Sequence, residues 1–483
     1  MLRRIMMNEW RILSRERILH LALPIYCVML VFGVMDGTAW RSFLESNVAA
    51  AQRLVDDQFA SVRKQVDRIE TGQVRPPNVL EDPRMPAAMA RTKNYEYATK
   101  PPGVTAAIAI GQSDLLASYV KVQWRPMFRQ SNAGEIQNPE TLATGVFDLS
   151  FVLIYLYPLL IIALSFNVLS AERESGTEVL LLSQPVTVST FVLGKVALRG
   201  SIVIGLAVIV STFGVLFANP EILSHDGLWR VGALGVLLIL YGAFWFGLSV
   251  LINALGWKSA TNALAMMSVW IALVLVAPTA SNLIATELYP LPSRVDLVEA
   301  LRRSDKEAQR EGEAGQAHGS ASNLLRMGQE ASLDVLAHNF YMQVMQVEQQ
   351  SEAEAAPVFR RFNAQKQRQQ GLAERLKYLS PAAIMQVALT ELADTSVRSF
   401  TSFSAQVELY HSEWRRYFLA LVEANRPMTS EEVAQIPRFR YQPEADSVVA
   451  QRVVANILAL SGIALIVVAA GFWRLRRYLP GAR

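Results

Sequence analysis

The chain contains 483 residues, of which 52% are hydrophobic and only 18% are charged, and its formal net charge is +4. This composition lies towards the membrane end of the globular range, and apolar runs of about 20 residues, enough to cross a bilayer, exclude an ordinary soluble protein. The arginines flank these runs and form no separate basic domain, which argues against nucleic-acid binding.

The chain opens with a basic stretch that is followed by a first apolar run at 19–38. A removable signal peptide is the alternative interpretation of this start, but Asp36-Gly37-Thr38 does not match a small-x-small cleavage site. We therefore interpret 19–38 as a membrane anchor. Cys27 is the single cysteine, so no intrachain disulfide can form and the regions outside the membrane must be held by packing.

Five further apolar runs complete a set of six predicted transmembrane helices. Their interiors are essentially free of charge, as burial in lipid demands. After the first run they lie at 148–169, 197–218, 230–254, 260–285 and 450–472.

The placement of arginines predicts how these helices are oriented. Arginines precede the first run and follow the last, so the positive-inside rule places both termini, including the tail 473–483, in the cytoplasm. Residues 39–147 and 287–449 then form two extracytoplasmic insertions, and a short loop near 219–229 also lies outside, while 170–196 and Gly256-Trp257-Lys258 lie inside. The flanking residues are Arg3, Arg4, Arg11, Arg15 and Arg17 at the start and Arg474, Arg476, Arg477 and Arg483 at the end.

The first insertion begins as a helix that continues out of the first span. Apolar residues recur there at steps of three and four, which predicts one buried stripe. Six prolines between 76 and 102 forbid a long helix beyond it. Residues 104–124 predict a short strand or two around a turn at 111–114, a small β element. The stripe consists of Val48, Val55, Phe59, Val62, Val66 and Ile69.

The second insertion is predicted to be mostly helical. Its clearest feature is a heptad-like run about three heptads long, which we call the aromatic seam. We favour a helix packed in the core of its own domain; the alternative is a docking surface for a partner subunit, another extracytoplasmic protein or cargo. The seam consists of Phe400, Phe403, Val407, Tyr410, Trp414, Tyr417 and Leu421.

Together these elements predict an α-helical integral membrane protein with six transmembrane helices and two largely helical extracytoplasmic insertions. No catalytic or metal-binding constellation is found in the sequence, because the five histidines are scattered and none has a second ligand at metal spacing. Gly256-Trp257-Lys258-Ser259 lacks the glycine spacing of a phosphate-binding loop. We therefore predict no metal and no cofactor in this chain, and no ATP hydrolysis by the chain alone. The histidines are His20, His225, His318, His338 and His411.

Small and amide side chains around the fourth span are interpreted as structural. Its glycines permit close helix contact, and packing is favoured over a role in transport. Asn253, Ser259 and Asn262 bracket the inner turn and are predicted to satisfy backbone groups at helix ends. The glycines are Gly232, Gly235, Gly242 and Gly247.

The inner segment 170–196 is the most informative part of the chain. Glu172, Glu174 and Glu178 stand near the start of a predicted helix, where acids oppose the N-terminal dipole. An apolar face follows at 179–182, and Pro185 ends the helix. A plainer interpretation is an ordinary re-entry loop anchored at the membrane surface.

Residues 172–186, Glu-Arg-Glu-Ser-Gly-Thr-Glu-Val-Leu-Leu-Leu-Ser-Gln-Pro-Val, with Gly194-Lys195 after them, resemble the coupling-helix region of ATP-binding-cassette permeases in the type-2 exporter class. Residues 145–148 and 149–167 resemble the second span of that class. The large insertions are similar to a branch with expanded outer domains, related to permeases linked to gliding motility and copper-enzyme maturation. Residues 111–115, 379–381 and 407–414 carry this second resemblance.

The resemblance implies a set of roles and partners. Residues 1–18 would form an amphipathic connecting helix with Trp10, Leu13 and Ile18 towards membrane lipid. The complex would contain two permease halves, identical or related, and two ATPase subunits that bind ATP and Mg. It would lie in a bacterial inner membrane. The residues that would dock into the separate ATPase are Glu172, Arg173, Glu174, Gly176, Thr177 and Pro185.

The function expected from this resemblance is that of a permease subunit which couples ATP hydrolysis by a separate ATPase to export. One alternative is a mechanotransmitter that relays ATP-driven motion to an extracytoplasmic partner without moving solute. The other is a membrane-anchored scaffold without energy coupling.

Overall fold

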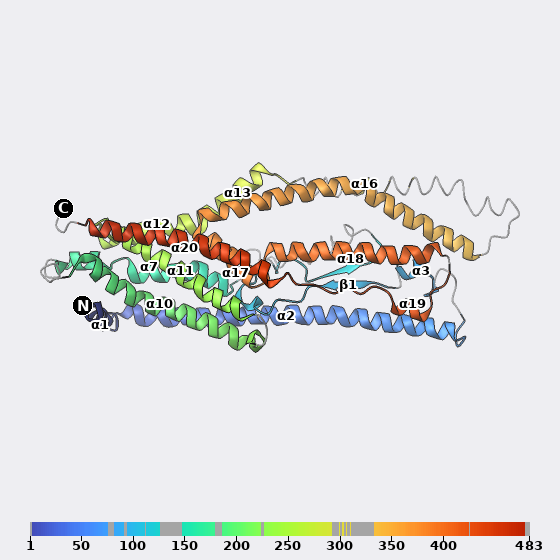
Figure 1. Cartoon of the computed structure of the whole chain (residues 1–483), viewed down its shortest axis with the longest axis horizontal. Helices are drawn as coiled ribbons and strands as arrows, with labels where there is room; N and C mark the ends of the chain where they lie inside the picture. The colour runs from blue at the N-terminus through green and yellow to red at the C-terminus, as the bar shows by residue number, and fades with distance from the viewer. Residues whose placement is uncertain are drawn as a thin grey trace.

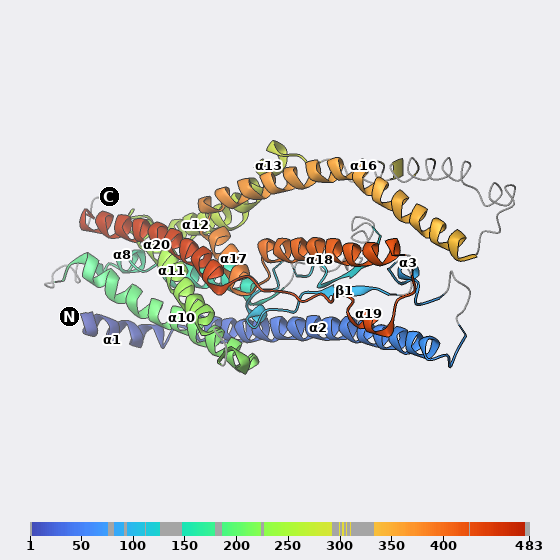
Figure 2. The ribbon, with the colours of Figure 1, turned by 45° about the vertical axis from the view of Figure 1, so that its right-hand side comes forward.

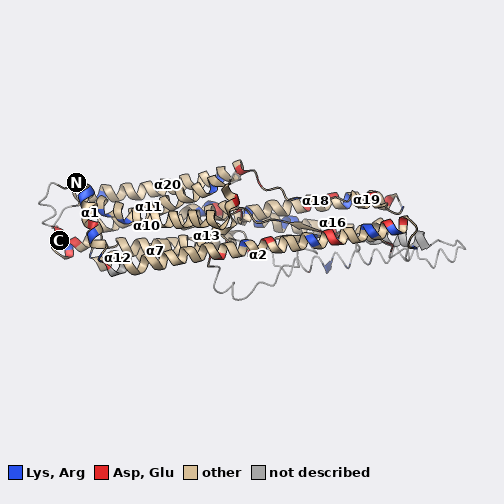
Figure 3. Ribbon diagram, turned by 90° about the horizontal axis from the view of Figure 1, so that it is seen from below, with Lys and Arg blue, Asp and Glu red and all other residues tan. Residues whose placement is uncertain are grey.

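The structure is a computed structural model of the whole chain. It describes residues 2–75, 82–90, 94–111, 113–125, 147–178, 186–223, 227–291, 299, 302–303, 306, 310, 333–424 and 426–478. These residues form an elongated molecule with both chain termini at one end (Figure 1). We call the half that holds the termini the bundle; charged side chains are sparse along its helices (Figure 3). The other half, the distal domain, comprises the described parts of residues 45–125, 333–376 and 397–445.

Six helical segments among the described residues are long and apolar enough to cross a membrane, which confirms the predicted fold class. The first lies in α2 (Arg17–Glu70), the third is α10 (Val188–Ala218), the fourth is α11 (Leu228–Asn253) and the sixth is α20 (Asp446–Arg476). The second contains α6 (Leu149–Phe151), a π-helical turn η3 (Val152–Leu156), α7 (Tyr157–Ser165) and α8 (Ser170–Glu174). The fifth contains α12 (Ser259–Trp270), a π-helical turn η5 (Ile271–Val276) and α13 (Ala277–Leu288).

The fourth span, α11, lies in the middle of the bundle and contacts α7, α10 and α20. Two of its predicted packing glycines allow close approach. A Cβ at Gly242 would lie 2.2 Å from Tyr157 Oη, and one at Gly247 would lie 2.6 Å from Val468 Cγ2. A Cβ at Gly232 would meet no atom within 4 Å. Close helix contact therefore explains Gly242 and Gly247, but not Gly232.

The helix α2 runs from the bundle to the far end of the distal domain without a break. Its 54 residues correspond to about 80 Å at 1.5 Å per residue. The predicted apolar stripe is confirmed, because Val48, Val55, Val62 and Val66 are buried along one side. A single long helix thus joins the two halves of the molecule (Figure 1).

The small β element is present, but it begins earlier than the sequence predicted. Strand β1 (Glu96–Thr99) pairs antiparallel with β2 (Tyr119–Val122), and Glu96 lies opposite Val122. Between the strands, a short 3-10 helix η2 (Ala106–Ile108) packs against α2. The prediction of strands around a turn at 111–114 is therefore wrong for the first strand, because residues 104–111 serve as a packed loop.

The rest of the distal domain is helical, as predicted. Its core contains Trp124, which follows β2, Met345 and the buried side of the helix over residues 397–423. A short α3 (Pro86–Ala88) and Val62 close this core from the other side. The remaining helices are α16 (Leu333–Leu376), η6 (Lys377–Leu379), α18 (Val397–Glu423) and α19 (Ser430–Ala434).

One helix of the second insertion belongs to the bundle core. α17 (Pro381–Leu392) contacts α11 and α20 and buries Ile384, Met385 and Leu389 among the side chains of the spans. It lies between the bundle and α18 in both side views (Figures 1 and 2). The distal domain is therefore seated on the bundle through α2 and α17.

Polar contacts tie the loop before η2 to the turn after α17. The Lys100 ammonium lies 2.9 Å from the Asp394 carboxylate, and Thr105 Oγ1 donates to Leu392 O at 2.5 Å. Thr395 Oγ1 donates to Ala109 O at 2.9 Å. Asp394 has a φ of 58°, a left-handed conformation that Asp tolerates better than most residues. The two insertions therefore also meet where the distal domain joins the bundle, in addition to their contacts in the distal core.

Candidate coupling site

The inner segment singled out by the sequence forms a short helix at the end of the molecule that holds the termini. α8 covers Ser170–Glu174 and is followed by a turn in which Gly176 has a φ of 74°. A side chain at this φ is strained, which explains the glycine. Ser175 and Gly176 are exposed, whereas Glu178 is buried. We call residues 174–177 the α8 tip.

Glu172 points inward from α8 and binds other parts of the chain. Its Oε1 accepts a hydrogen bond from Lys195 Nζ of α10 at 2.7 Å. Its Oε2 accepts another from the Thr177 hydroxyl. The side chain therefore fixes α8 to the third span and the turn to α8, because a carboxylate bound to an ammonium makes a charge-assisted hydrogen bond.

A buried ion pair extends this contact to the first helix. α1 (Leu2–Leu13) carries Glu9, which is 1% exposed, and Arg199 Nε donates to Glu9 Oε1 at 2.8 Å. Arg199 also donates to Leu164 O, and Lys195 Nζ lies 3.6 Å from Glu9 Oε2. Two carboxylates and two cations are thus in contact, with backbone carbonyls taking up further donors. Pairing of this kind is what allows charges to be buried.

This ion pair corrects the expectation that the span interiors are essentially free of charge. Arg199 falls inside the predicted span 197–218 and is buried. It is accommodated because α1 packs alongside α10 and brings Glu9 to it (Figure 2). Sequence inspection could have found the pair from one signal: Glu9 is a single acid in an otherwise basic N-terminal helix.

Arg173 and Glu174 form hydrogen bonds with the turn between the fourth and fifth spans. Arg173 donates to Gly256 O at 2.5 Å and to Trp257 O. The Glu174 carboxylate accepts from Ser259 N at 2.6 Å and from Ser259 Oγ at 2.9 Å. Gly256 has a φ of 77°, which makes the tight turn possible. The two charged side chains therefore cap both sides of this turn.

Asn253 satisfies backbone groups at helix ends as predicted, whereas Asn262 binds the Asn253 side chain instead. Asn253 Oδ1 accepts from Leu169 N at 3.2 Å, and Asn253 Nδ2 donates to Ser249 O at 2.9 Å. Asn262 Nδ2 donates to Asn253 Oδ1 at 3.3 Å. The Leu169–Asn253 bond holds the start of α8 against the end of α11.

The sequence as a whole matches a known family. The sequence model of a protein family, described as ABC-2 family transporter protein, matches residues 3–478, which include both insertions. The chain belongs to the ABC-2 transporter family. No curated protein matches it. The chain is therefore a multi-pass membrane protein and the permease component of an ABC transporter, and the family implies an ABC ATPase and a second permease as partners.

In this ABC-2 permease the first helix corrects one expectation of the resemblance. Trp10 is 50% exposed on α1, as a lipid-facing side chain would be. Leu13, in contrast, is fully buried in the bundle core and does not face lipid. The reason is that α1 packs along α10 and turns its last residue inward. Arg17 and Ile18 belong to α2, and the Ile18 side chain lies outside the described residues.

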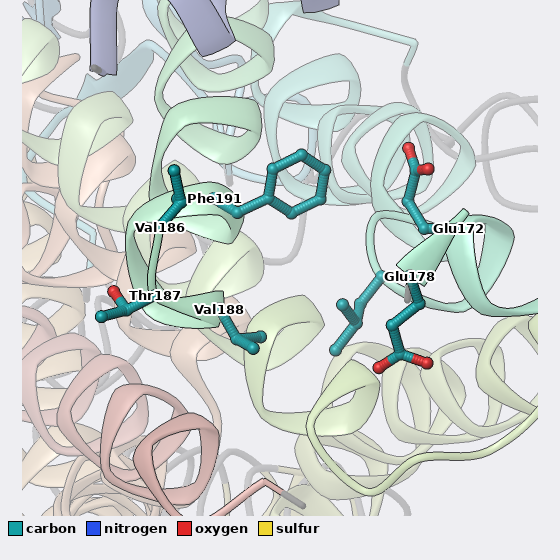
Figure 4. A pocket seen from close by; sticks show the side chains of 7 residues that line it. Glu172, Glu178, Val186, Thr187, Val188 and Phe191 are labelled. Carbon is teal, nitrogen blue, oxygen red and sulfur yellow. The ribbon is translucent and has the colours of Figure 1, made fainter. Parts of the chain in front are cut away.

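A small pocket opens between α8 and the start of α10 in the permease. Glu172, Glu178 and Phe191 lie around it together with Val186–Val188 and Leu169 (Figure 4). The Phe191 ring lies on the Glu172 side of the pocket (Figure 4), and Lys195 Nζ lies 4.9 Å from its centroid. Burial and the neighbouring Glu178 carboxylate raise the pKa of Tyr478 near the C-terminus. Pro185 and the apolar face at 179–182 lie outside the described residues.

The aromatic seam of the permease faces its own domain. Phe403, Val407 and Trp414 are at most 2% exposed and pack in the core of the distal domain. Phe400 and Tyr410 are buried as well, and Tyr417 is partly buried, with its hydroxyl donating to Glu432 O at 2.6 Å. Since these side chains are covered by α2, α3 and β2, the structure favours the core-packing interpretation of the seam over a docking surface.

Proposed function

We propose that this ABC-2 permease is the membrane subunit of an ATP-driven exporter and that its α8 tip docks into a separate ATPase. The observation that supports it is that two residues of the tip are exposed, while the charged side chains beside them are held by the rest of the chain. Ser175 and Gly176 are exposed, whereas Glu172, Arg173 and Glu174 each bind another element of the chain. A partner that pushes on the tip would therefore act on several spans at once.

The coupling mechanism in this proposal is a rigid-body switch. ATP and Mg bind to the ATPase, and closure of its dimer moves the α8 tip. Glu172 carries the motion through Lys195 to the third span and through the Glu9–Arg199 pair to α1. Arg173 and Glu174 carry it to the turn between the fourth and fifth spans. Packed cores of this kind are bistable, so a small shift at one end is converted into a change between two arrangements.

The proposed assembly contains two permease halves and two ATPase subunits in a bacterial inner membrane, with both termini cytoplasmic. The described arginines before the first span and after the last support this orientation, because they lie at the end of the molecule where N and C are marked (Figure 3). The expanded distal domain supports membership of the branch related to gliding-motility and copper-enzyme-maturation permeases.

The docking role is tested at the exposed tip. Ser175→Arg adds a long side chain where an ATPase groove would lie, and Ser412→Arg makes the same change at an exposed position on α18. We expect S175R to reduce the ATPase retained in a detergent pull-down about tenfold, a typical loss at an interface hot spot. S412R should retain it. Retention at the wild-type level by S175R, with S412R behaving in the same way, would overturn the proposal.

This design is sharper than a charge reversal at Glu172 and Glu174. The double variant Glu172→Arg with Glu174→Arg is also expected to lose the ATPase. It would, however, break the Lys195 contact and the Ser259 contacts at the same time. A loss could then reflect a misplaced α8 instead of a blocked interface.

Relay of motion to an extracytoplasmic partner is the second candidate function. The unbroken α2 and the position of α17 in the bundle core favour it, because both connect the spans rigidly to the distal domain. Reconstituted vesicles in which ATP hydrolysis changes the conformation of the distal domain, yet no cargo accumulates, would support relay of motion over export. A membrane-anchored scaffold would instead leave the activity of the ATPase the same with and without this subunit.

A further inference from the structure

Two spans contain a π-helical turn that is followed two residues later by a proline. In η3, Tyr157 N donates to Val152 O, and in η5, Ala277 N donates to Ala272 O, in each case a carbonyl five residues earlier. Pro158 and Pro278 come next and have no N–H. Each proline therefore leaves backbone carbonyls of the preceding turn without a donor from the same helix.

In the second span the missing donor comes from a neighbouring span. Tyr241 Oη of α11 donates to Ile154 O at 3.0 Å. Ile154 is four residues before Pro158, so its carbonyl is one that the proline cannot serve. Both groups are buried, and the contact stays inside the bundle. Backbone groups exposed by a proline in a membrane helix are commonly satisfied in this way.

In the fifth span the donor comes from outside the spans. Ser380 Oγ lies 2.5 Å from Leu273 O and donates to it. Leu273 is five residues before Pro278 and is the next carbonyl in the π-helical pattern. Ser380 is 1% exposed, and its Oγ also accepts from Ala383 N at 3.1 Å, which caps α17. One hydroxyl therefore joins the π-helical turn of the fifth span to the first turn of α17.

The other end of α17 is fastened to the remaining parts of the molecule. Leu392 O accepts from Arg230 of the fourth span at 3.1 Å as well as from Thr105 of the first insertion. Glu391 lies 2.9 Å from Arg452 of the sixth span. Asp394 then accepts from Ser399 Oγ at 2.6 Å, just inside α18. A displacement of α17 is therefore passed to both insertions.

We infer that Ser380 is a positioning residue that couples bending of the fifth span at its π-helical turn to α17 and so to the distal domain. A π-helical turn is a weak point at which a helix changes its bend. The fifth span is bonded at its start to Glu174 through Ser259, so the α8 tip and Ser380 act on the same span. The inference rests on the proposed function for the input, while the contact between Ser380 and Leu273 stands on geometry alone.

The contact itself is tested without an ATPase, by a double-mutant cycle. Ser380→Gly removes the hydroxyl, and glycine is tolerated at a helix N-cap with a small loss. Pro278→Ala supplies an N–H that can reach Leu273 O. We expect S380G to lower the melting temperature of the solubilised chain clearly in the wild-type background and much less in the P278A background. An equal loss in both backgrounds would overturn the assignment of Ser380 to this carbonyl.

The coupling is tested in the assembly that co-purifies with the chain. Because Cys27 is the single cysteine, a Cys27→Ser background allows spin labels at Lys258→Cys, on the inner turn, and Ser412→Cys, on α18. We expect ATP with vanadate to change the distance between the labels in the wild type and in Ser380→Thr, which keeps the hydroxyl. In S380G the change should fall by at least half while ATPase binding is unaltered.

The outcomes separate the inference from the proposed function. A full distance change in S380G overturns the inference, and so does a wild type that shows no change although its ATPase is stimulated. Failure of the permease to bind or stimulate the ATPase overturns the proposed function instead. In that case the double-mutant cycle still decides whether Ser380 holds the π-helical turn.

Discussion

Arg199 and Glu9 are 190 positions apart in the sequence, yet Arg199 donates to the Glu9 carboxylate through Nε at 2.8 Å and Nη2 at 2.5 Å. Both side chains are buried, so this pair fixes α1 against the third span. It also places Lys195 between Glu9 and Glu172, within 3.6 Å of the first and 2.7 Å of the second. The first helix and the α8 segment therefore share a cation.

Removing Glu9 should destabilise the protein strongly. Glu9→Gln leaves the Arg199 charge buried without its carboxylate, while Lys195 keeps Glu172. Breaking a buried pair from one side costs about 3–5 kcal/mol. We expect a clear fall in the melting temperature of the solubilised chain. Arg11→Gln, an exposed change on the same helix, is the control and should have little effect. The double variant Glu9→Gln with Arg199→Met should recover much of the loss. A single variant as stable as wild type would contradict this account of the pair.

Replacing Arg173 by lysine should reduce coupling more than stability. Arg173 reaches the carbonyls of both Gly256 and Trp257, and a single ammonium cannot reproduce this forked geometry. We expect R173K to keep its expression and its ATPase partner but to lower the stimulation of ATP hydrolysis. The measurement is the ATPase rate of the reconstituted complex. Lys258→Arg, an exposed change on the same turn, should leave the rate unchanged. Equal rates for R173K and wild type would show that the two contacts of Arg173 with the Gly256 and Trp257 carbonyls are not needed for coupling.

Two glycines of the fourth span should respond in opposite ways to alanine. A Cβ at Gly242 would lie 2.2 Å from Tyr157 Oη and 2.8 Å from Ile204 Cγ1, so G242A should cost about 1–3 kcal/mol by overpacking. Gly232 has open space around its Cα, so G232A should be neutral or stabilise the helix by up to about 1 kcal/mol.

The cause of the G242A effect can be checked by a second change. Tyr157→Phe removes the nearest atom, so the double variant G242A with Y157F should be less destabilised than the sum of the two single variants. Thermal unfolding of the four proteins in detergent measures this. Strict additivity would mean that the clash with the Tyr157 hydroxyl is not what makes G242A costly.

Glu96 should make the distal domain less stable as the pH rises. Burial raises the pKa of Glu96 to about 7 from an ordinary 4.5, despite Arg438 Nε at 2.6 Å. Since the folded pKa exceeds the unfolded one, the contribution of Glu96 is fully present below pH 4.5 and is lost as the pH passes 7. The shift corresponds to about 3 kcal/mol. Glu96→Gln should remove this pH dependence, measured as the melting temperature between pH 4.5 and 8.

His411 provides a control with the opposite sign. Burial lowers the pKa of His411 from its ordinary 6.5, and Nε2 lies 3.0 Å from Arg125 O. Its contribution is present above pH 6.5 and is lost as the pH falls through the lower folded value. His411→Gln should therefore change the melting temperature profile on the acid side only. If the melting temperature depends on pH in the same way in E96Q and in the wild type, the titration of buried Glu96 is not the cause of the loss of stability at high pH.

The local sequence was sufficient for the elements that depend on one continuous segment. Long apolar runs identify the spans, because lipid requires about 20 apolar residues whatever the rest of the fold does. The three-and-four spacing from Val48 to Val66 correctly indicates one buried side of α2. The same spacing from Phe400 to Trp414 indicates the buried side of α18, and the charged motif at 172–177 carries a resemblance to the family that residues 3–478 match.

Only the tertiary structure decided which distant groups meet. In the sequence, Glu172 and Glu174 are acids near the start of a predicted helix, and nothing there shows that they bind Lys195 and Ser259 in the fold. Leu13 turns from lipid to the core because α1 packs on α10. The physical reason is that periodicity records which side of a helix is apolar, and does not record which helix covers that side. Long-range pairs such as Arg199 with Glu9 or Ser380 with Leu273 are satisfied only once the helices are packed.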